Sequence, residues 1–162
     1  MKKTPTKEEL MLSMADLCAR SEQCSFDISK KLRTKGLGYS DAQEVVENLK
    51  ARGFIDNYRY ARSFARDKVR FSAWGKRKIR LALISKRIDS ATIDEAFEEI
   101  DAEDYADALR RAALSKARQL DLNEYQDRLK LYKYLISRGF ESSLSSLAVK
   151  NLARNENIEP DI

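Results

Sequence analysis

The 162-residue sequence contains no histidine and only two cysteines, Cys18 and Cys24. Without an imidazole there is no usual general base, and every Ser-His-Asp or Cys-His arrangement is excluded. Two thiols alone make neither the usual structural zinc site nor a disulfide framework. No glycine-rich run has the pattern of a phosphate-binding loop. The sequence therefore predicts a protein that is not an enzyme and takes no metal, cofactor or small-molecule substrate.

Long apolar runs are also missing. A membrane-spanning helix needs about 20 consecutive apolar residues, and the apolar runs here are far shorter. No apolar stretch follows residues 1–5, so we expect no signal peptide. Hydrophobic residues make up 43% of the chain and charged residues 35%, a composition typical of folded, soluble proteins. We expect a cytoplasmic protein with reduced thiols and no membrane contact.

Helix breakers are scarce, because the chain has five glycines and two prolines, the prolines lying near its two ends. The glycines fall where helices are expected to end in a left-handed residue. Helix starts are predicted at capping residues, namely Thr6 with Glu9, Ser40 with Gln43, Asp89, and Asn123. No segment alternates apolar and polar residues strongly enough to indicate a strand. The predicted fold class is all-α.

The sequence repeats itself with offsets of 51 and 52 residues. Matching apolar positions in the three copies are Ile28, Ile79 and Leu131; Leu32, Leu83 and Leu135; Val46, Phe97 and Val149; and Leu49, Ile100 and Leu152. Turns match at Gly36-Leu37, Arg87-Ile88 and Gly139-Phe140. Spacings of three and four place the apolar positions on one helical face. We predict three stacked three-helix repeats, over residues 1–56, 57–100 and 101–162, the last with a short C-terminal tail.

Charge is unevenly distributed along these repeats. Residues 57–88 contain eleven basic residues and one acidic residue, whereas residues 89–107 contain nine acidic residues and no basic one. Four arginines recur at helical spacing: Arg59, Arg62, Arg66 and Arg70. An apolar stripe lies one position earlier, at Tyr58, Ala61, Ala65 and Val69. Such a helix can pack by one face and present guanidinium groups to phosphate, although a basic stripe is often only a solvated face.

Two features of this region leave alternatives open. The basic residues can serve DNA or an acidic protein groove. The acidic residues 89–107 can be a second docking surface, although we favour an intramolecular partner for the basic segment. Aromatic side chains among the basic residues could stack on bases, but for Phe64 and Trp74 we favour packing in the core.

Three motifs resemble the RecX family of RecA regulators. They are the run Gly53-Phe54-Ile55-Asp56-Asn57-Tyr58-Arg59-Tyr60-Ala61, the basic helix Trp74-Gly75-Lys76-Arg77-Lys78-Ile79-Arg80-Leu81-Ala82-Leu83, and Arg138-Gly139-Phe140. The signature positions among them are Gly53, Ile55, Asp56, Arg59, Ala61, Gly75, Ile79, Leu83, Gly139 and Phe140. Two positions depart from the family pattern. Asn57 replaces an Asp, with an altered helix N-cap as the expected effect, and Arg87 replaces a Gly, which predicts a different turn or a longer helix before Ile88.

The resemblance implies an all-helical, elongated and curved body of three tandem three-helix repeats. Such proteins bind the RecA filament, with the single-stranded DNA inside it, and mostly inhibit RecA in DNA repair and the SOS response. We expect a monomer whose filament and phosphate contacts are Arg59, Arg62, Arg66, Arg70, Lys76, Arg77, Lys78 and Arg80. Two other classes stay open: a sequence-nonspecific DNA-binding protein that acts without RecA, and a structural adaptor that binds only proteins.

Overall fold

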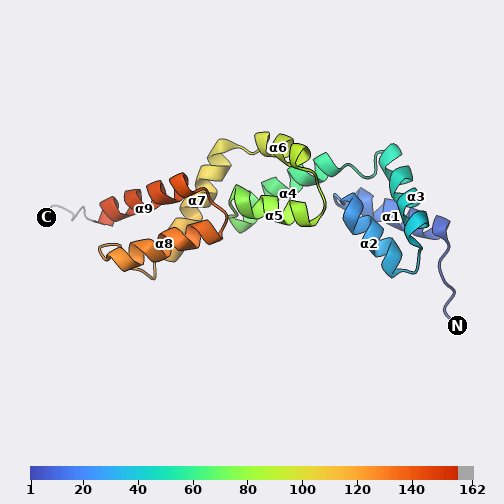
Figure 1. The fold of residues 1–162 in the computed structure, drawn as a ribbon, viewed down its shortest axis with the longest axis horizontal. Helices are drawn as coiled ribbons and strands as arrows, with labels where there is room; N and C mark the ends of the chain where they lie inside the picture. Colours follow the sequence, from blue (N-terminus) through green and yellow to red (C-terminus); the bar gives the residue numbers. More distant parts are fainter. Residues whose placement is uncertain (157–162) are drawn as a thin grey trace. The chain divides into compact units, whose positions relative to one another are not determined.

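The computed structural model describes residues 1–156 (Figure 1). Its helices are α1 (Lys7–Arg20), α2 (Ser25–Thr34), α3 (Tyr39–Ala51), α4 (Asn57–Ser72), α5 (Lys76–Ser85), α6 (Ser90–Glu98), α7 (Ala102–Ala117), α8 (Tyr125–Ser137) and α9 (Ser142–Glu156). No strand occurs within residues 1–156, so the prediction of an all-α fold is confirmed.

These helices form two compact units. The first contains Met1–Ser63 and Leu83–Ala96, and the second contains Phe64–Ala82 and the chain from Phe97 onward. The repeat predicted over residues 57–100 therefore contributes to both units, because α4 and α5 each begin in one unit and end in the other.

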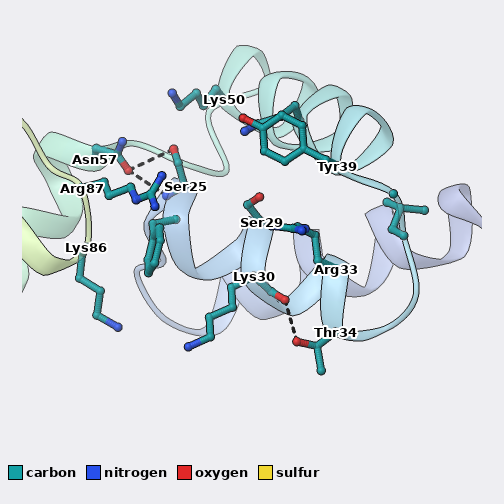
Figure 2. A pocket seen from close by; sticks show the side chains of 14 residues that line it. Ser25, Ser29, Lys30, Arg33, Thr34, Tyr39, Lys50, Asn57, Lys86 and Arg87 are labelled. Carbon is teal, nitrogen blue, oxygen red and sulfur yellow. Dashed lines mark hydrogen bonds between the residues drawn. The ribbon is translucent and has the colours of Figure 1, made fainter.

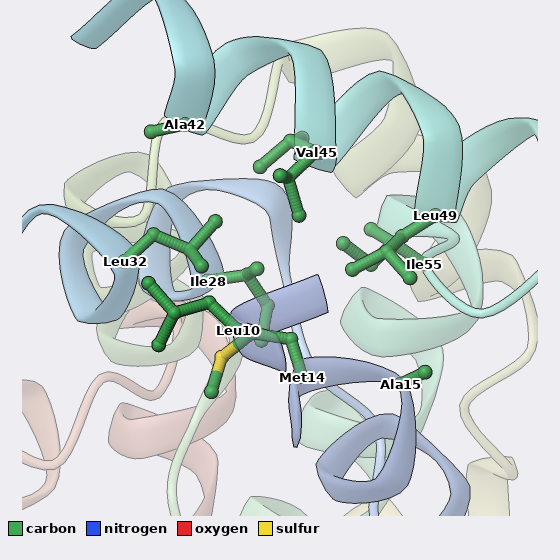
Figure 3. Close-up of a cluster of buried hydrophobic side chains, with 10 residues drawn as sticks. Leu10, Met14, Ala15, Ile28, Leu32, Ala42, Val45, Leu49 and Ile55 are labelled. Atoms are coloured by element: carbon green, nitrogen blue, oxygen red, sulfur yellow. The ribbon is translucent and has the colours of Figure 1, made fainter. Parts of the chain in front are cut away.

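The core of the first unit lies between α1, α2 and α3 (Figure 3). Each helix contributes a pair of buried side chains four residues apart: Leu10 and Met14, Ile28 and Leu32, and Val45 and Leu49. A spacing of four places both members of a pair on the same face of their helix. Ile55, in the loop after α3, completes the cluster at 2% exposure. Full burial stabilises each large aliphatic side chain by about 1.5–3 kcal/mol.

The second unit is built around α7, α8 and α9. Leu131 and Leu135 of α8 are completely buried, as is Phe140 in the loop before α9. The Phe140 ring contacts that of Tyr105 on α7, with the centroids 5.7 Å apart. In Figure 1, α8 and α9 lie side by side, joined by the short loop that carries Phe140.

The repeat appears in the geometry of the turn that ends α2, α5 and α8. In each copy one residue has a left-handed backbone: φ is 97° at Gly36, 57° at Arg87 and 94° at Gly139. The next N–H donates to the matching leucine carbonyl five residues earlier, at 3.1 Å from Leu37, 3.2 Å from Ile88 and 3.1 Å from Phe140. All three are the same helix C-terminal motif. The expectation of a different turn or a longer helix before Ile88 is therefore wrong.

Arg87 adopts this conformation at a cost, because an L-residue with a Cβ loses about 1–2 kcal/mol in the left-handed region. Its guanidinium lies 5.2 Å from the centroid of the Phe26 ring, a contact worth about 0.5–1 kcal/mol at an exposed site. We therefore expect Arg87→Gly to be more stable than Arg87→Ala by about 1–2 kcal/mol, because only glycine relieves the backbone. Urea unfolding of both variants measures this difference.

Arg52 provides the matched control for that prediction. It also follows a helix and also lies over an aromatic ring, that of Phe54 at 5.2 Å, but its φ is −87°. At Arg52 the order of stability should reverse, so that Arg52→Ala is more stable than Arg52→Gly. The same order at both positions would contradict the assignment of strain to Arg87.

The helix starts are only partly as predicted. Thr6 and Glu9 form the capping box of α1, and Asp89 accepts from the Thr92 N–H at 2.8 Å at the start of α6. The prediction for Ser40 is wrong, because α3 already begins at Tyr39 with Gly38 as its N-cap. Asn123 is also wrong, since Glu124 occupies the N-cap position of α8.

Both cysteines are free thiols. Cys18 is half-buried against the core of the first unit, and Cys24 is completely buried at the N-cap of α2. Burial raises the pKa of the Cys24 thiol to about 11. The thiol is therefore protonated at neutral pH, which makes it a poor nucleophile.

Candidate nucleic-acid interface

The residues predicted to contact phosphate lie on α4 and α5, and we call them the α4–α5 cations: Arg59, Arg62, Arg66, Arg70, Lys76, Arg77, Lys78 and Arg80. α4 begins where Asp56 Oδ1 accepts from the Arg59 N–H at 3.0 Å. The apolar stripe of this helix is buried at Ala61, Ala65 and Val69. The stripe beside it is exposed at Arg62, Arg66 and Arg70. The two faces therefore separate as the periodicity predicts.

Arg59 and Arg62 belong to the first unit. Arg59 is half-buried: its Nε lies 2.5 Å from Glu22 Oε1, and its Nη2 donates to the carbonyls of Gly53 at 3.1 Å and Phe54 at 3.3 Å. The guanidinium thus fixes the loop between α3 and α4. Arg62 is exposed and lies over the Tyr58 ring at 5.7 Å.

The remaining α4–α5 cations belong to the second unit. Arg70 Nε donates to Asp104 Oδ2 at 2.6 Å, and this hydrogen bond raises the pKa of Arg70. Arg66 forms a looser pair with Asp67, at 3.3 Å. Asp104 lies in the acidic segment 89–107, so one member of that segment does pair with the basic segment of the same chain.

On α5, three cations lie over aromatic rings. Lys76 Nζ is 4.9 Å from the Tyr105 ring centroid, Lys78 Nζ is 4.5 Å from that of Trp74, and the Arg80 guanidinium carbon is 5.0 Å from that of Phe97. Burial, with Arg138 and Lys68 nearby, lowers the pKa of Lys78. Arg77 is exposed. Trp74 and Phe64 are half-buried and meet edge to face at 6.4 Å.

Tyr105 holds the start of α5, which carries these cations. Its hydroxyl accepts from the Lys76 N–H at 3.0 Å and donates to Glu141 Oε2 at 2.7 Å. Burial, opposed by the Lys76 N–H and assisted by Glu141, raises the pKa of this hydroxyl. The group is therefore a neutral donor and acceptor at physiological pH.

Tyr105→Phe should destabilise the protein by about 1–3 kcal/mol, because it removes the acceptor of the Lys76 N–H and the donor to Glu141 in a mostly buried setting. Tyr132→Phe is the control, since that hydroxyl bonds Ser142 Oγ at an exposed position. We expect it to cost no more than about 0.5 kcal/mol. Equal losses in urea unfolding would contradict a structural role for the Tyr105 hydroxyl.

Most residues of the RecX-like motifs pack in the core or set the backbone geometry. Ile55, Ala61, Ile79, Leu83 and Phe140 are buried. Gly53 has a φ of 78° after α3. Gly75 and Gly139 bring two backbones together, with the Gly75 N–H donating to Arg138 O at 2.8 Å and the Arg77 N–H to Gly139 O at 3.0 Å. A Cβ on Gly75 would lie 2.2 Å from the Gly139 carbonyl carbon.

A second basic site, which we call the α2 groove, lies wholly within the first unit (Figure 2). It is a hollow of about 760 Å³ lined by α2, the start and end of α3, and the turn after α5. Its cations are Lys30, Arg33, Lys50, Lys86 and Arg87. None of the described residues that line it is acidic. None of these residues was predicted as a contact from the sequence, although Lys30, Lys31, Arg33 and Lys35 form a short basic run that indicates the site.

Asn57, the first residue of α4, also lines the groove. Its Oδ1 accepts from the Ser25 N–H at 2.9 Å and the Ser25 hydroxyl at 3.2 Å. Asn57 thereby supplies an acceptor for the first N–H of α2, whose N-cap residue, Cys24, makes no side-chain capping hydrogen bond. Asp56 is the residue that caps α4. Asn57 therefore acts at the start of α2, and Asp56 supplies the capping oxygen of α4.

No group of His, Cys, Asp and Glu side chains suited to hold a metal ion occurs in residues 1–156. Over the same residues, every helix is too short or too polar to cross a lipid bilayer.

Two family models match the chain in tandem: the second three-helix domain of RecX over residues 56–96 and the third three-helix domain of RecX over residues 103–149. Together they cover more than half of the chain. The chain belongs to the RecX family. The RecX resemblance seen in the sequence motifs is thereby confirmed.

Named relatives agree with this assignment. The chain is 31% identical over 131 residues to the regulatory protein RecX of Clostridium beijerinckii, covering 78% of this chain and 60% of the relative. It is 28% identical over 155 residues to the regulatory protein RecX of Prosthecochloris aestuarii, covering 96% and 100%. The chain thus spans about three fifths of the Clostridium relative. These names describe regulatory proteins and not enzymes, as the sequence predicts.

Solved structures support the fold. A crystal structure of a regulatory protein RecX superposes with a TM-score of 0.77 at 25% identity, covering 90% of this chain and 73% of that one. The RecX of Lactobacillus salivarius gives the same TM-score at 18% identity, which bears on the fold alone. The prediction of tandem three-helix repeats is confirmed by these structures and by the two domain models.

Proposed function

We propose that this chain regulates a RecA recombinase by binding the RecA filament on single-stranded DNA and inhibiting it. The observation that carries the proposal is the tandem match to two consecutive RecX domains, which places this chain among regulatory proteins. The absence of histidine agrees with an action through binding.

We propose that Arg62, Arg66 and Arg77 make the phosphate or filament contacts among the α4–α5 cations. Their side chains are exposed, and a surface ion pair such as that of Arg66 with Asp67 is worth only about 0–1 kcal/mol, so it yields readily to a phosphate. Arg59 serves instead to fix the loop before α4. Arginine suits this role because its planar fork matches phosphate oxygens.

The proposal is tested by titrating the protein into preformed RecA filaments on single-stranded DNA while ATP hydrolysis is followed. Binding to the same DNA without RecA is measured in parallel. We expect hydrolysis to fall at protein concentrations too low to coat bare DNA. Unchanged hydrolysis would overturn the proposal.

The second candidate function is sequence-nonspecific DNA binding without RecA, which the α2 groove favours because its lining cations face no acidic lining residue. This alternative predicts tight binding to bare DNA with a steep salt dependence and no change in RecA hydrolysis beyond competition for DNA.

A further inference from the structure

The α2 groove combines features that a merely solvated helix surface does not require. Lys30 and Arg33 lie three residues apart on α2, so their side chains emerge from one helical face. Lys86 and Arg87 come from the turn after α5, and Lys50 comes from the end of α3 (Figure 2). Three segments distant in sequence thus bring five cations around one hollow. Bringing like charges together costs energy unless an anion binds between them.

The existing ion pairs leave most of this charge available. Lys86 Nζ lies 2.8 Å from Asp27, and Lys50 Nζ lies 3.8 Å from Glu47, neither of which lines the groove. Within residues 1–156, no carboxylate pairs with Lys30, Arg33 or Arg87. A second hollow of about 430 Å³ shares Lys30 and Lys86 with the groove, and its other charged lining residues are Lys31, Lys35 and one carboxylate, Asp27.

The backbone conformation of Arg87 is the strongest indication that the groove is functional. The corresponding turn positions of the other two repeats are Gly36 and Gly139, and all three share a left-handed backbone. A glycine would fit the turn without strain, yet this chain places there an arginine that lines the groove. Strained residues concentrate at functional sites, where the strain is offset by what the side chain does.

The ring of Tyr39 provides a surface in the groove on which a planar group can stack. The first residue of α3, it lines the groove and is 62% exposed, with the Arg33 guanidinium carbon 5.6 Å from its ring centroid. An aromatic ring beside cations is the combination that binds single-stranded nucleic acid, where bases stack and phosphates pair with arginine and lysine. The hollow measures about 760 Å³, within the range of about 300–1,000 Å³ that is typical of ligand sites.

We propose that the α2 groove binds single-stranded nucleic acid, with the phosphodiester backbone on Lys30, Arg33 and Arg87 and a base against Tyr39. The site lies on the first unit and contains none of the α4–α5 cations. The groove adds to the proposed function a second site at which the protein contacts DNA. Binding of nucleic acid in the groove does not require RecA.

The test measures fluorescence anisotropy of a short labelled oligo(dT) with the full chain at several salt concentrations, without RecA. Arg87→Gly is the main variant, because it removes the guanidinium while relieving the turn. We expect it to weaken binding about tenfold and to lower the slope of log affinity against log salt by about one. Arg52→Ala removes one charge from the same unit outside the groove and should bind as the parent chain does.

Further variants test the cations of α2 and the ring of Tyr39 separately. Lys30→Gln with Arg33→Gln should weaken binding by about two orders of magnitude, whereas Arg118→Gln with Lys133→Gln, an equal loss of charge at exposed positions elsewhere, should have little effect. Tyr39→Phe should keep the affinity and Tyr39→Ala should lower it about tenfold, because the ring and not the hydroxyl stacks on a base.

Asn57→Asp is the complementary variant. It preserves the acceptor for Ser25 and adds a carboxylate to the lining, so we expect weaker binding without unfolding. Parental affinity and salt slope in the Arg87 and Lys30/Arg33 variants would overturn the inference, as would failure of the parent chain to bind at low salt. If the groove variants bind oligo(dT) more weakly but the parent chain does not change ATP hydrolysis by RecA, only the proposed function is overturned. If the parent chain inhibits hydrolysis but the groove variants bind oligo(dT) as the parent does, only the assignment of the groove is overturned.

Discussion

Gly139→Ala should destabilise the second unit by about 2–5 kcal/mol. Two costs add at this residue. Its φ of 94° is unfavourable for a residue with a Cβ, at about 1–2 kcal/mol. A Cβ would also lie 2.4 Å from Lys78 N and 2.9 Å from Gly75 O, so the backbone of α5 must move, and overpacking costs about 1–3 kcal/mol more. The displaced backbone would carry with it the cations of α5.

Gly36→Ala is the control for this prediction. Gly36 occupies the same turn in the first repeat, with a φ of 97°, but no atom lies within 4 Å of the Cβ that alanine would add. It should lose only the conformational cost of about 1–2 kcal/mol. Urea unfolding of both variants separates the two costs. Equal losses would mean that the close approach of Gly75 and Gly139 contributes nothing.

Reversal of Arg62, Arg66 and Arg77 to Glu should reduce inhibition of RecA at least about a thousandfold, because each lost charge-assisted contact costs about 1.5–3 kcal/mol. The far-ultraviolet circular dichroism should not change, since all three side chains are exposed. The control is Arg118→Glu with Lys133→Glu and Lys150→Glu, which changes the net charge equally at exposed positions elsewhere.

The two sets of variants distinguish a local interface from a general effect of charge. Retained inhibition in the first triple variant would exclude the α4–α5 cations as the contact. Equal loss in both would mean that net charge alone, through long-range attraction to DNA, accounts for binding.

Much of the fold follows from the sequence because it depends on local spacing. Ile28, Ile79 and Leu131 align in the repeat, and all three are completely buried. Thr6 and Glu9 cap α1 because the capping box needs only residues three apart. Ser40 has the same spacing with Gln43, but Gly38 supplies the extended residue and the helix begins earlier. Side-chain spacing alone does not choose between neighbouring starts.

The site was harder to predict because its parts come from distant segments. The stripe on α4 is local, so periodicity finds it. The α2 groove is not local: Arg33 and Arg87 lie 54 positions apart in the sequence, and only folding of the first unit brings their segments to one hollow. The left-handed backbone of Arg87 is likewise imposed by the repeat geometry against the preference of the residue. The role of Arg59 in holding two loop carbonyls has no sequence signal either.

Co-sedimentation with preformed RecA filaments on single-stranded DNA shows whether this chain acts on the RecA filament. The protein is held at a concentration and salt at which it does not sediment with the same DNA alone. We expect the parent protein to sediment with the filament and to saturate it. The variant with Arg62, Arg66 and Arg77 reversed to Glu should stay in the supernatant. Parent protein that stays in the supernatant with filaments, or that sediments equally with bare DNA, would contradict an action on the RecA filament.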